Sequence, residues 1–317
     1  MRIPTKPLVL FGLALFVYII WNTGPLKILN TLLSIDQRFL LVSLLFPIPG
    51  TLLKAYRWKR VVAYLKKKIS LLEATKVWLV GLSASTITPG RAGDVIRGFY
   101  LADKTKLTLG KSISTVVIDR LFDVVSMTML AIIGLFVLMF WFNVPFSISI
   151  VIFVVFMLFS SLMLVTNKRL VRIILGPLYK FVVPQKYKQK IKLSFDQFYL
   201  GLREMADKKR IAYLLAVSLF AWGLTFFQAY FIFLALHTDV PLLFLFAVLP
   251  IEILVSLIPV TVSGFGTREF TYLFFFSLIG IAPEIVVAFS LLSVLIVWIT
   301  AAIGFGFWLK EPIDIRL

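Results

Sequence analysis

Long apolar runs constrain this chain more than any other feature of its sequence. Six of them approach or exceed the roughly 20 residues that an α-helix needs to cross a bilayer: residues 8–24, 38–56, 113–141, 147–166, 211–236 and 284–309. They show little period-2 alternation, which excludes an outer-membrane barrel. Charged residues make up only 15% of the 317 residues, too few to cover a soluble body of this size. The sequence therefore predicts an all-α polytopic membrane protein, with residues 1–317 forming one integral membrane domain.

Positive charge gathers between these apolar runs and gives the net charge of +18. Residues 54–72 hold seven basic groups and no acid, residues 97–111 hold four and one, and residues 167–210 hold twelve and three. Such blocks are typical of cytoplasmic loops. We therefore expect a multi-pass protein of the cell (cytoplasmic) membrane with both termini in the cytoplasm, and no nucleic-acid partner.

Two of these blocks allow a more specific interpretation. Residues 54–68 suit an interfacial helix that binds anionic lipid, although ordinary solvated charge is the favoured account. Residues 167–210 suit a basic cytoplasmic helical linker. The chain has no cysteine and a single histidine, His237, which we interpret as an external-loop residue. Thiolate chemistry and a histidine-based metal site are therefore excluded, and we expect no metal and no cofactor.

Two further stretches, residues 73–97 and 242–281, carry a Gly/Pro break with charge between apolar halves. If the first crossed the bilayer fully, the basic residues of 97–111 and 167–210 would both lie outside. In the second, residues 270–281 give only about 18 Å of helix, too short to cross. We therefore predict about six full transmembrane helices plus two opposed re-entrant hairpins, with their breaks near the midplane. Such opposed, interrupted segments point to a transporter's binding site.

The first break reads Pro-Gly-Arg-Ala-Gly-Asp-Val-Ile-Arg at residues 89–97. Its glycines allow a tight turn, and Asp94 stands where it can cap the helix that follows. A helix start with arginines is a cradle for phosphate, because free N–H groups and guanidinium forks both bind oxyanions. The candidate substrate-binding residues here are Gly90, Arg91, Gly93, Asp94 and Arg97. The alternative is that Asp94 and Arg97 form only a local ion pair.

The second break has the same ingredients, a proline and two glycines followed by a basic and an acidic residue. Hydroxyls and glycine amides can bond a headgroup there, and an arginine can supply the positive charge. The candidates are Ser263, Gly264, Gly266, Thr267, Arg268 and Glu269. The alternative is a buried bend in which Glu269 favours the helix dipole.

Three other carboxylates lie close to or within apolar helices. Asp119 and Asp123 share a helical face with Arg120, which is a further candidate for substrate binding. Both aspartates can balance arginine charge or carry a coupling proton, and the alternative is an interfacial cluster that fixes helix depth. Glu252 stands alone in an apolar run, which suggests a protonated or arginine-paired carboxyl with a role in charge balance, coupling or gating.

Three of these motifs together resemble a known family. Pro-Gly-Arg-Ala-Gly-Asp-x-x-Arg at 89–97, Val-Ile-Asp-Arg-Leu-Phe-Asp at 117–123 and Ser-Gly-Phe-Gly-Thr-Arg-Glu at 263–269 are similar to the lysylphosphatidylglycerol synthase transmembrane-region family. This flippase-like domain also occurs in stand-alone bacterial and archaeal proteins. The resemblance implies a lipid-binding or lipid-translocating protein. Because the chain ends at Leu317, aminoacyl-transferase activity is not carried over, and Asp94 stands where the family often has Glu.

The leading hypothesis is a flippase or transporter for an anionic phospholipid, glycolipid or polyprenyl-phosphate-linked lipid, and not an enzyme. Arginines at the two breaks would hold the phosphate. A second hypothesis is a membrane enzyme acting on a lipid phosphate, with Asp119 and Asp123 holding Mg²⁺. A third is a non-transporting anchor that binds a cytoplasmic lipid-modifying enzyme or glycosyltransferase through residues 167–210.

Overall fold

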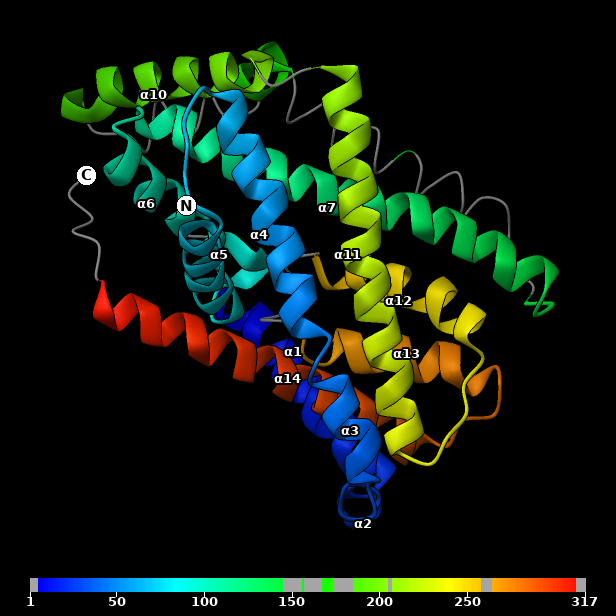
Figure 1. Cartoon of the computed structure of the whole chain (residues 1–317). Helices are drawn as coiled ribbons and strands as arrows, with labels where there is room; N and C mark the ends of the chain where they lie inside the picture. The colour runs from blue at the N-terminus through cyan, green and yellow to red at the C-terminus, as the bar shows by residue number, and fades with distance from the viewer. Residues whose placement is uncertain are drawn as a thin grey trace.

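The computed structural model describes residues 5–144, 156, 167–173, 185–204, 207–257 and 264–311, and every regular element within these ranges is a helix. Figure 1 shows them packed as one bundle. The elements are α1 (Thr5–Thr23), α2 (Pro25–Leu33), α3 (Gln37–Ser43), α4 (Pro47–Tyr64), α5 (Leu71–Thr86), η1 (Pro89–Val95), α6 (Ile96–Thr105), α7 (Leu109–Phe140), α10 (Gln185–Glu204), α11 (Lys208–Ala235), α12 (Leu242–Leu257), α13 (Thr267–Ser277) and α14 (Pro283–Lys310).

Four helical stretches are long and apolar enough to cross a membrane: Gln37–Tyr64, α7, α11 and α14. A fifth exists if α1 and α2 together form one bent span. The predicted all-helical, multi-pass architecture is therefore confirmed, with four or five candidate spans among the described residues where the sequence predicted six. The predicted span 147–166 lies outside the described residues, apart from residue 156.

The first predicted span, residues 8–24, does not continue straight. Gly24 adopts a φ of 95° and Pro25 opens α2, so the chain turns by 77° between α1 and α2. Glycine reaches this left-handed region at no steric cost, and proline removes the N–H that would have extended α1. The bend explains why the apolar run ends at this point.

The interrupted stretch 73–97 folds as two helices joined by a 3₁₀ turn, η1. Ser70 and Glu73 form a capping box that begins α5, and Thr86 ends it. Glu73 in the first turn of α5 lies 3.3 Å from the Nζ of Lys104, in the last turn of α6. The chain therefore runs along α5, turns through η1 and returns along α6, so that the end of α6 lies beside the start of α5.

A similar arrangement holds at α12 and α13. Phe244 near the start of α12 and Phe276 near the end of α13 have ring centroids 5.6 Å apart. The connecting break is described from Gly264, and its two glycines have φ values of 79° and 83°. Residues 258–263 lie outside the described residues.

The two ends of the bundle differ in charge. At one end, the Nε2 atom of His237 lies 2.8 Å from the carbonyl oxygen of Ser34. The N–H of Asp36 donates to the carbonyl oxygen of Ala235 at 2.9 Å. Arg38 holds the pKa of the Asp36 carboxyl down at about 2. The end of α4 and the start of α11, which carry described parts of the basic blocks, lie at the opposite end, where α10 lies in Figure 1. There Lys111 pairs with Glu204 at 2.7 Å, and Lys76 and Lys104 lie within 4.0 Å of Glu311.

Candidate functional site

Six charged side chains form a buried ion network, the arginine–aspartate cluster. Its members are Arg57, Asp94, Arg97, Asp119, Arg120 and Asp123. The three arginines and three aspartates balance one another in charge. They come from α4, η1, α6 and α7, so the cluster ties the first broken segment to two of the long helices.

Arg57 makes hydrogen bonds to two aspartates and a serine from the interior of the bundle. Its Nε donates to Asp119 at 2.7 Å, and its Nη1 donates to Asp123 at 2.8 Å and to the hydroxyl of Ser218 at 2.6 Å. Its side chain is fully buried. The expectation that residues 54–68 carry solvated charge is therefore wrong for Arg57, because the basic segment continues as α4 into the interior of the bundle.

The first break places its own charges in the same network. Arg97 is fully buried and donates to Asp119 at 2.9 Å. Arg97 also donates to Oδ2 of Asp94. The same Oδ2 atom accepts a second hydrogen bond, from Arg120 at 2.5 Å. Asp94 does not cap the following helix as the sequence suggested, because its carboxylate is directed to these two arginines. Gly93 allows the backbone contact that η1 needs, since a Cβ there would lie 2.2 Å from the carbonyl oxygen of Ala84.

The second break forms a separate, smaller group, the Glu269 cluster, made of Gly266, Arg268, Glu269 and Ser290. The N–H of Gly266 donates to Glu269 at 2.7 Å, as in a capping box. Arg268 donates to Glu269 at 2.7 Å and to Ser290 at 2.9 Å. The amide of Gly266, one of those expected to bond a headgroup, is thus already used within the fold.

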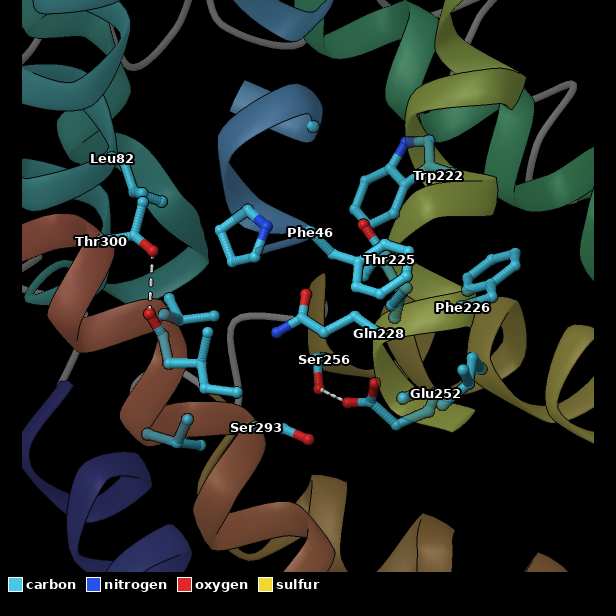
Figure 2. A pocket seen from close by; sticks show the side chains of 18 of the residues that line it. Phe46, Leu82, Trp222, Thr225, Phe226, Gln228, Glu252, Ser256, Ser293 and Thr300 are labelled. Atoms are coloured by element: carbon cyan, nitrogen blue, oxygen red, sulfur yellow. Dashed lines mark hydrogen bonds between the residues drawn. The ribbon is translucent and has the colours of Figure 1, made fainter. Parts of the chain in front are cut away.

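Glu252 lies on α12 beside this cluster. It accepts one hydrogen bond from the hydroxyl of Ser256, one helical turn later, and another from Tyr272 of α13 at 3.0 Å. Only 4% of its surface is exposed. Figure 2 shows the bond between Ser256 and Glu252 at the edge of an open space, with Gln228 of α11 directed into it.

That space is a cavity of about 230 Å³ enclosed by α4, α5, α7, α11, α12, α13 and α14. Arg120 of the arginine–aspartate cluster and Arg268 of the Glu269 cluster both line it. A third cation, Lys54, lines it as well and lies 3.7 Å from the ring centre of Trp222. The remaining wall combines apolar and aromatic groups with hydroxyls and one amide, including Thr225, Gln228, Ser256, Ser293 and Thr300 (Figure 2).

The structure gathers most of the residues that the sequence singled out, but into different roles. Arg97, Asp119 and Asp123 lie in the ion network, whereas Arg120, Glu252 and Arg268 reach the cavity. Thr267 donates to the carbonyl of Gly264 at 3.1 Å. Ser263 and the side chain of Arg91 lie outside what the structure describes, and Gly90 is described only as part of η1.

Sequence reasoning missed several residues of the site: Lys54, Arg57, Trp222, Gln228 and Ser290. Arg57 sits among other basic residues of one segment, and nothing in the spacing separates it from the exposed Arg60. The adjacent apolar run 38–56 is the one signal that could have marked it, because a charge so near a span is costly to bury without a partner.

Comparison with known proteins gives the family of the chain. A model of the lysylphosphatidylglycerol synthase TM region matches residues 8–304. The chain belongs to this family. The match covers both breaks, the arginine–aspartate cluster and every residue that lines the cavity.

Relatives of this TM-region protein occur among archaea. It is 26% identical to a UPF0104 membrane protein of Methanocaldococcus jannaschii, over 93% of this chain and 89% of the relative. It is 24% identical to a UPF0104 membrane protein of Methanothermobacter thermautotrophicus, over 94% and 92% of the two chains. A Pyrococcus horikoshii UPF0104 membrane protein is also 24% identical, over 94% of each chain.

Proposed function

We propose that this protein is a flippase that moves an anionic lipid between leaflets, and that the lipid phosphate binds in the cavity between the two broken segments. One observation carries the proposal: Arg120, bonded to the first break through Asp94, and Arg268, at the second break, line the same cavity. A site shared by two interrupted segments that enter from opposite sides is typical of transporters. The anionic lipid is the partner that this chemistry fits.

The chemistry of the cavity wall supports an anionic, amphipathic ligand. Guanidinium groups bind phosphate through two parallel hydrogen bonds, and Lys54 adds a third positive charge. The side chain of Arg120 is 26% exposed and that of Arg268 is 12% exposed, whereas Arg57 and Arg97 are fully enclosed by aspartates. We therefore assign substrate binding to Arg120, Arg268 and Lys54, and a supporting role to Arg57 and Arg97.

The same proposal includes six full spans and two opposed re-entrant hairpins, with both termini in the cytoplasm. The return of α6 to the start of α5, and of α13 to the start of α12, supports the hairpins. The gathering of Lys76, Lys104 and Lys111 at one end, near the end of α14, supports a cytoplasmic side there. The two connections that hold Ser34 and His237 would then face outward.

The arrangement of the aspartates argues against an enzyme that uses Mg²⁺. Asp119 accepts hydrogen bonds from Arg57 and Arg97, and Asp123 accepts from Arg57 and the indole of Trp222. A hard cation needs carboxylate oxygens directed at it, and here they are directed at guanidinium groups. We therefore propose that the chain acts without catalysis.

The proposal predicts that Arg120→Gln/Arg268→Gln loses bound anionic lipid. Each charged hydrogen bond contributes about 1.5–3 kcal/mol, so we expect affinity to fall at least about tenfold. Native mass spectrometry of the gently extracted protein measures the lipid that stays bound, and fluorescent phosphatidylglycerol in proteoliposomes measures translocation. Arg38→Gln, at the exposed ion pair with Asp36, is the matched control. Unchanged lipid retention and unchanged translocation in the double variant would overturn the proposal.

A further inference from the structure

We propose that Glu252 is the proton-binding site that couples lipid movement to a proton gradient, an inference that rests on the proposed function. Glu252 is the one carboxylate among the described residues that line the cavity. The positively charged groups proposed to bind phosphate line the same space. A carboxylate in this place can therefore set the net charge that an incoming anionic headgroup meets.

The hydrogen bonds of Glu252 suit a group that changes its protonation state. Its two carboxylate oxygens accept from two hydroxyls, Ser256 on its own helix and Tyr272 on α13. A hydroxyl can donate to the charged carboxylate and, after rotating, accept from the protonated carboxyl. Both forms of Glu252 can thus be hydrogen-bonded without moving a helix.

Among the described residues, the titratable and charged neighbours of Glu252 on α13 are three. They are Tyr272, which bonds it directly, and Arg268 and Glu269 one turn earlier on the same helix. Across the cavity, Arg120 of α7 and Lys54 of α4 face the same space. The residues of α11 and α14 that line the cavity, among them Gln228 and Ser293, do not titrate. Loss of the negative charge of Glu252 therefore raises the positive potential at Arg268 and at the phosphate site.

This electrostatic link makes proton and anionic lipid bind together. A proton taken from water on one side forms an O–H bond on the Glu252 carboxyl, and the neutral carboxyl favours entry of the phosphate. On the other side the O–H bond breaks, the proton returns to water, and the restored negative charge favours release of the phosphate. A singly charged phosphate moving with one proton transfers no net charge.

A metal cation fits this position less well than a proton. Each carboxylate oxygen already directs one lone pair at the hydrogen of a hydroxyl donor. Among the described residues, no group of three acidic or histidine side chains is placed to hold a metal ion. The geometry therefore points to a proton and leaves sodium as the outcome that the experiment must exclude.

The experiment uses the full chain in vesicles of phosphatidylcholine and phosphatidylglycerol with a trace of fluorescent phosphatidylglycerol. Valinomycin and potassium hold the voltage at zero while a gradient of about two pH units is imposed in either direction. With one proton moved per lipid, two pH units set an upper limit of about a hundredfold on the directional ratio. We therefore expect wild-type translocation from the acidic to the alkaline side to exceed the reverse by at least about tenfold. Glu252→Gln should translocate at the same rate in both directions, and Glu284→Gln, a surface carboxylate of α14, should behave like wild type.

Two further measurements keep the proposal testable if Glu252→Gln is inactive. Infrared difference spectra between about pH 5 and about pH 8 should show a protonated carboxylic acid in wild type that Glu252→Gln lacks. Tyr272→Phe should move the midpoint of the wild-type pH response to higher pH, because the carboxylate loses a donor.

Each outcome separates the two proposals. If wild-type translocation does not depend on the pH gradient, or depends on a sodium gradient instead, proton coupling through Glu252 is overturned. The proposed flippase function is then unaffected. A pH response that persists in Glu252→Gln would place the proton elsewhere and also overturn the inference. Absence of any translocation by wild type would overturn the proposed function itself.

Discussion

Arg57→Ala is expected to destabilise the protein by about 3–5 kcal/mol, the cost of leaving buried charges without a partner. Arg57 is fully buried and donates to Asp119 and Asp123. Without Arg57, each of these buried carboxylates loses a positively charged hydrogen-bond donor. The hydroxyl of Ser218 loses a partner as well. Thermal unfolding of the detergent-solubilised protein, followed by loss of monodispersity, measures the effect.

The matched control is Arg60→Ala, three residues later on the same helix. Arg60 is exposed and its guanidinium carbon lies 6.0 Å from the ring centre of Tyr213, so we expect a change within about 0.5 kcal/mol. Arg57→Lys should also destabilise, because an ammonium group cannot reproduce the fork that reaches two aspartates. Equal stability of Arg57→Ala and Arg60→Ala would show that the cluster does not hold the helices together.

Gly304→Ala is expected to cost about 3 kcal/mol, at the upper end of the usual cost of overpacking a core. A Cβ at Gly304 would lie 2.1 Å from the carbonyl oxygen of Leu79, which is backbone and cannot rotate away. Ser83 of α5 also bonds the carbonyl of Ala301 across the same contact. The added methyl group must therefore push α5 and α14 apart along a face where small residues bring the helices close together.

Gly306→Ala, two residues further along α14, provides the control. Nothing lies within 4 Å of a Cβ at this position, so the substitution should be neutral or slightly stabilising through helix propensity. The same thermal measurement compares the two variants. A destabilisation of similar size in both would mean that the effect comes from α14 itself and not from its contact with α5.

Much of the fold could be predicted from the sequence, because crossing a bilayer leaves a strong and local signal. The apolar runs 113–141, 211–236 and 284–309 correspond to α7, α11 and α14 within a few residues. The 77° turn at Gly24 was not predicted, although Gly24 and Pro25 can both be read from the sequence. A Gly-Pro pair ends a helix but does not determine the direction in which the chain continues.

The candidate site was harder to predict, since pairing across helices leaves no local pattern. The sequence placed Arg97 near Asp94 by its i, i+3 spacing, and the structure contains that pair. The arginine that Asp119 and Asp123 share is Arg57, more than sixty residues earlier, and its basic neighbours on α4 concealed it. Whether an arginine faces a cavity or an aspartate depends on tertiary packing, which no spacing rule encodes.

The close approach of Gly266 to α1 has a consequence for how the chain is made. A Cβ at Gly266 would lie 2.6 Å from the carbonyl oxygen of Gly12, and Phe16 packs edge-on against Phe265 at 5.2 Å. During synthesis α1 leaves the ribosome about 250 residues before its neighbour exists. The first helix therefore lacks its contacts with α13 until the last fifth of the chain has been translated, and α2 is the neighbour that it has before then. A nascent chain stalled before residue 264 should leave α1 accessible to crosslinking by the translocon.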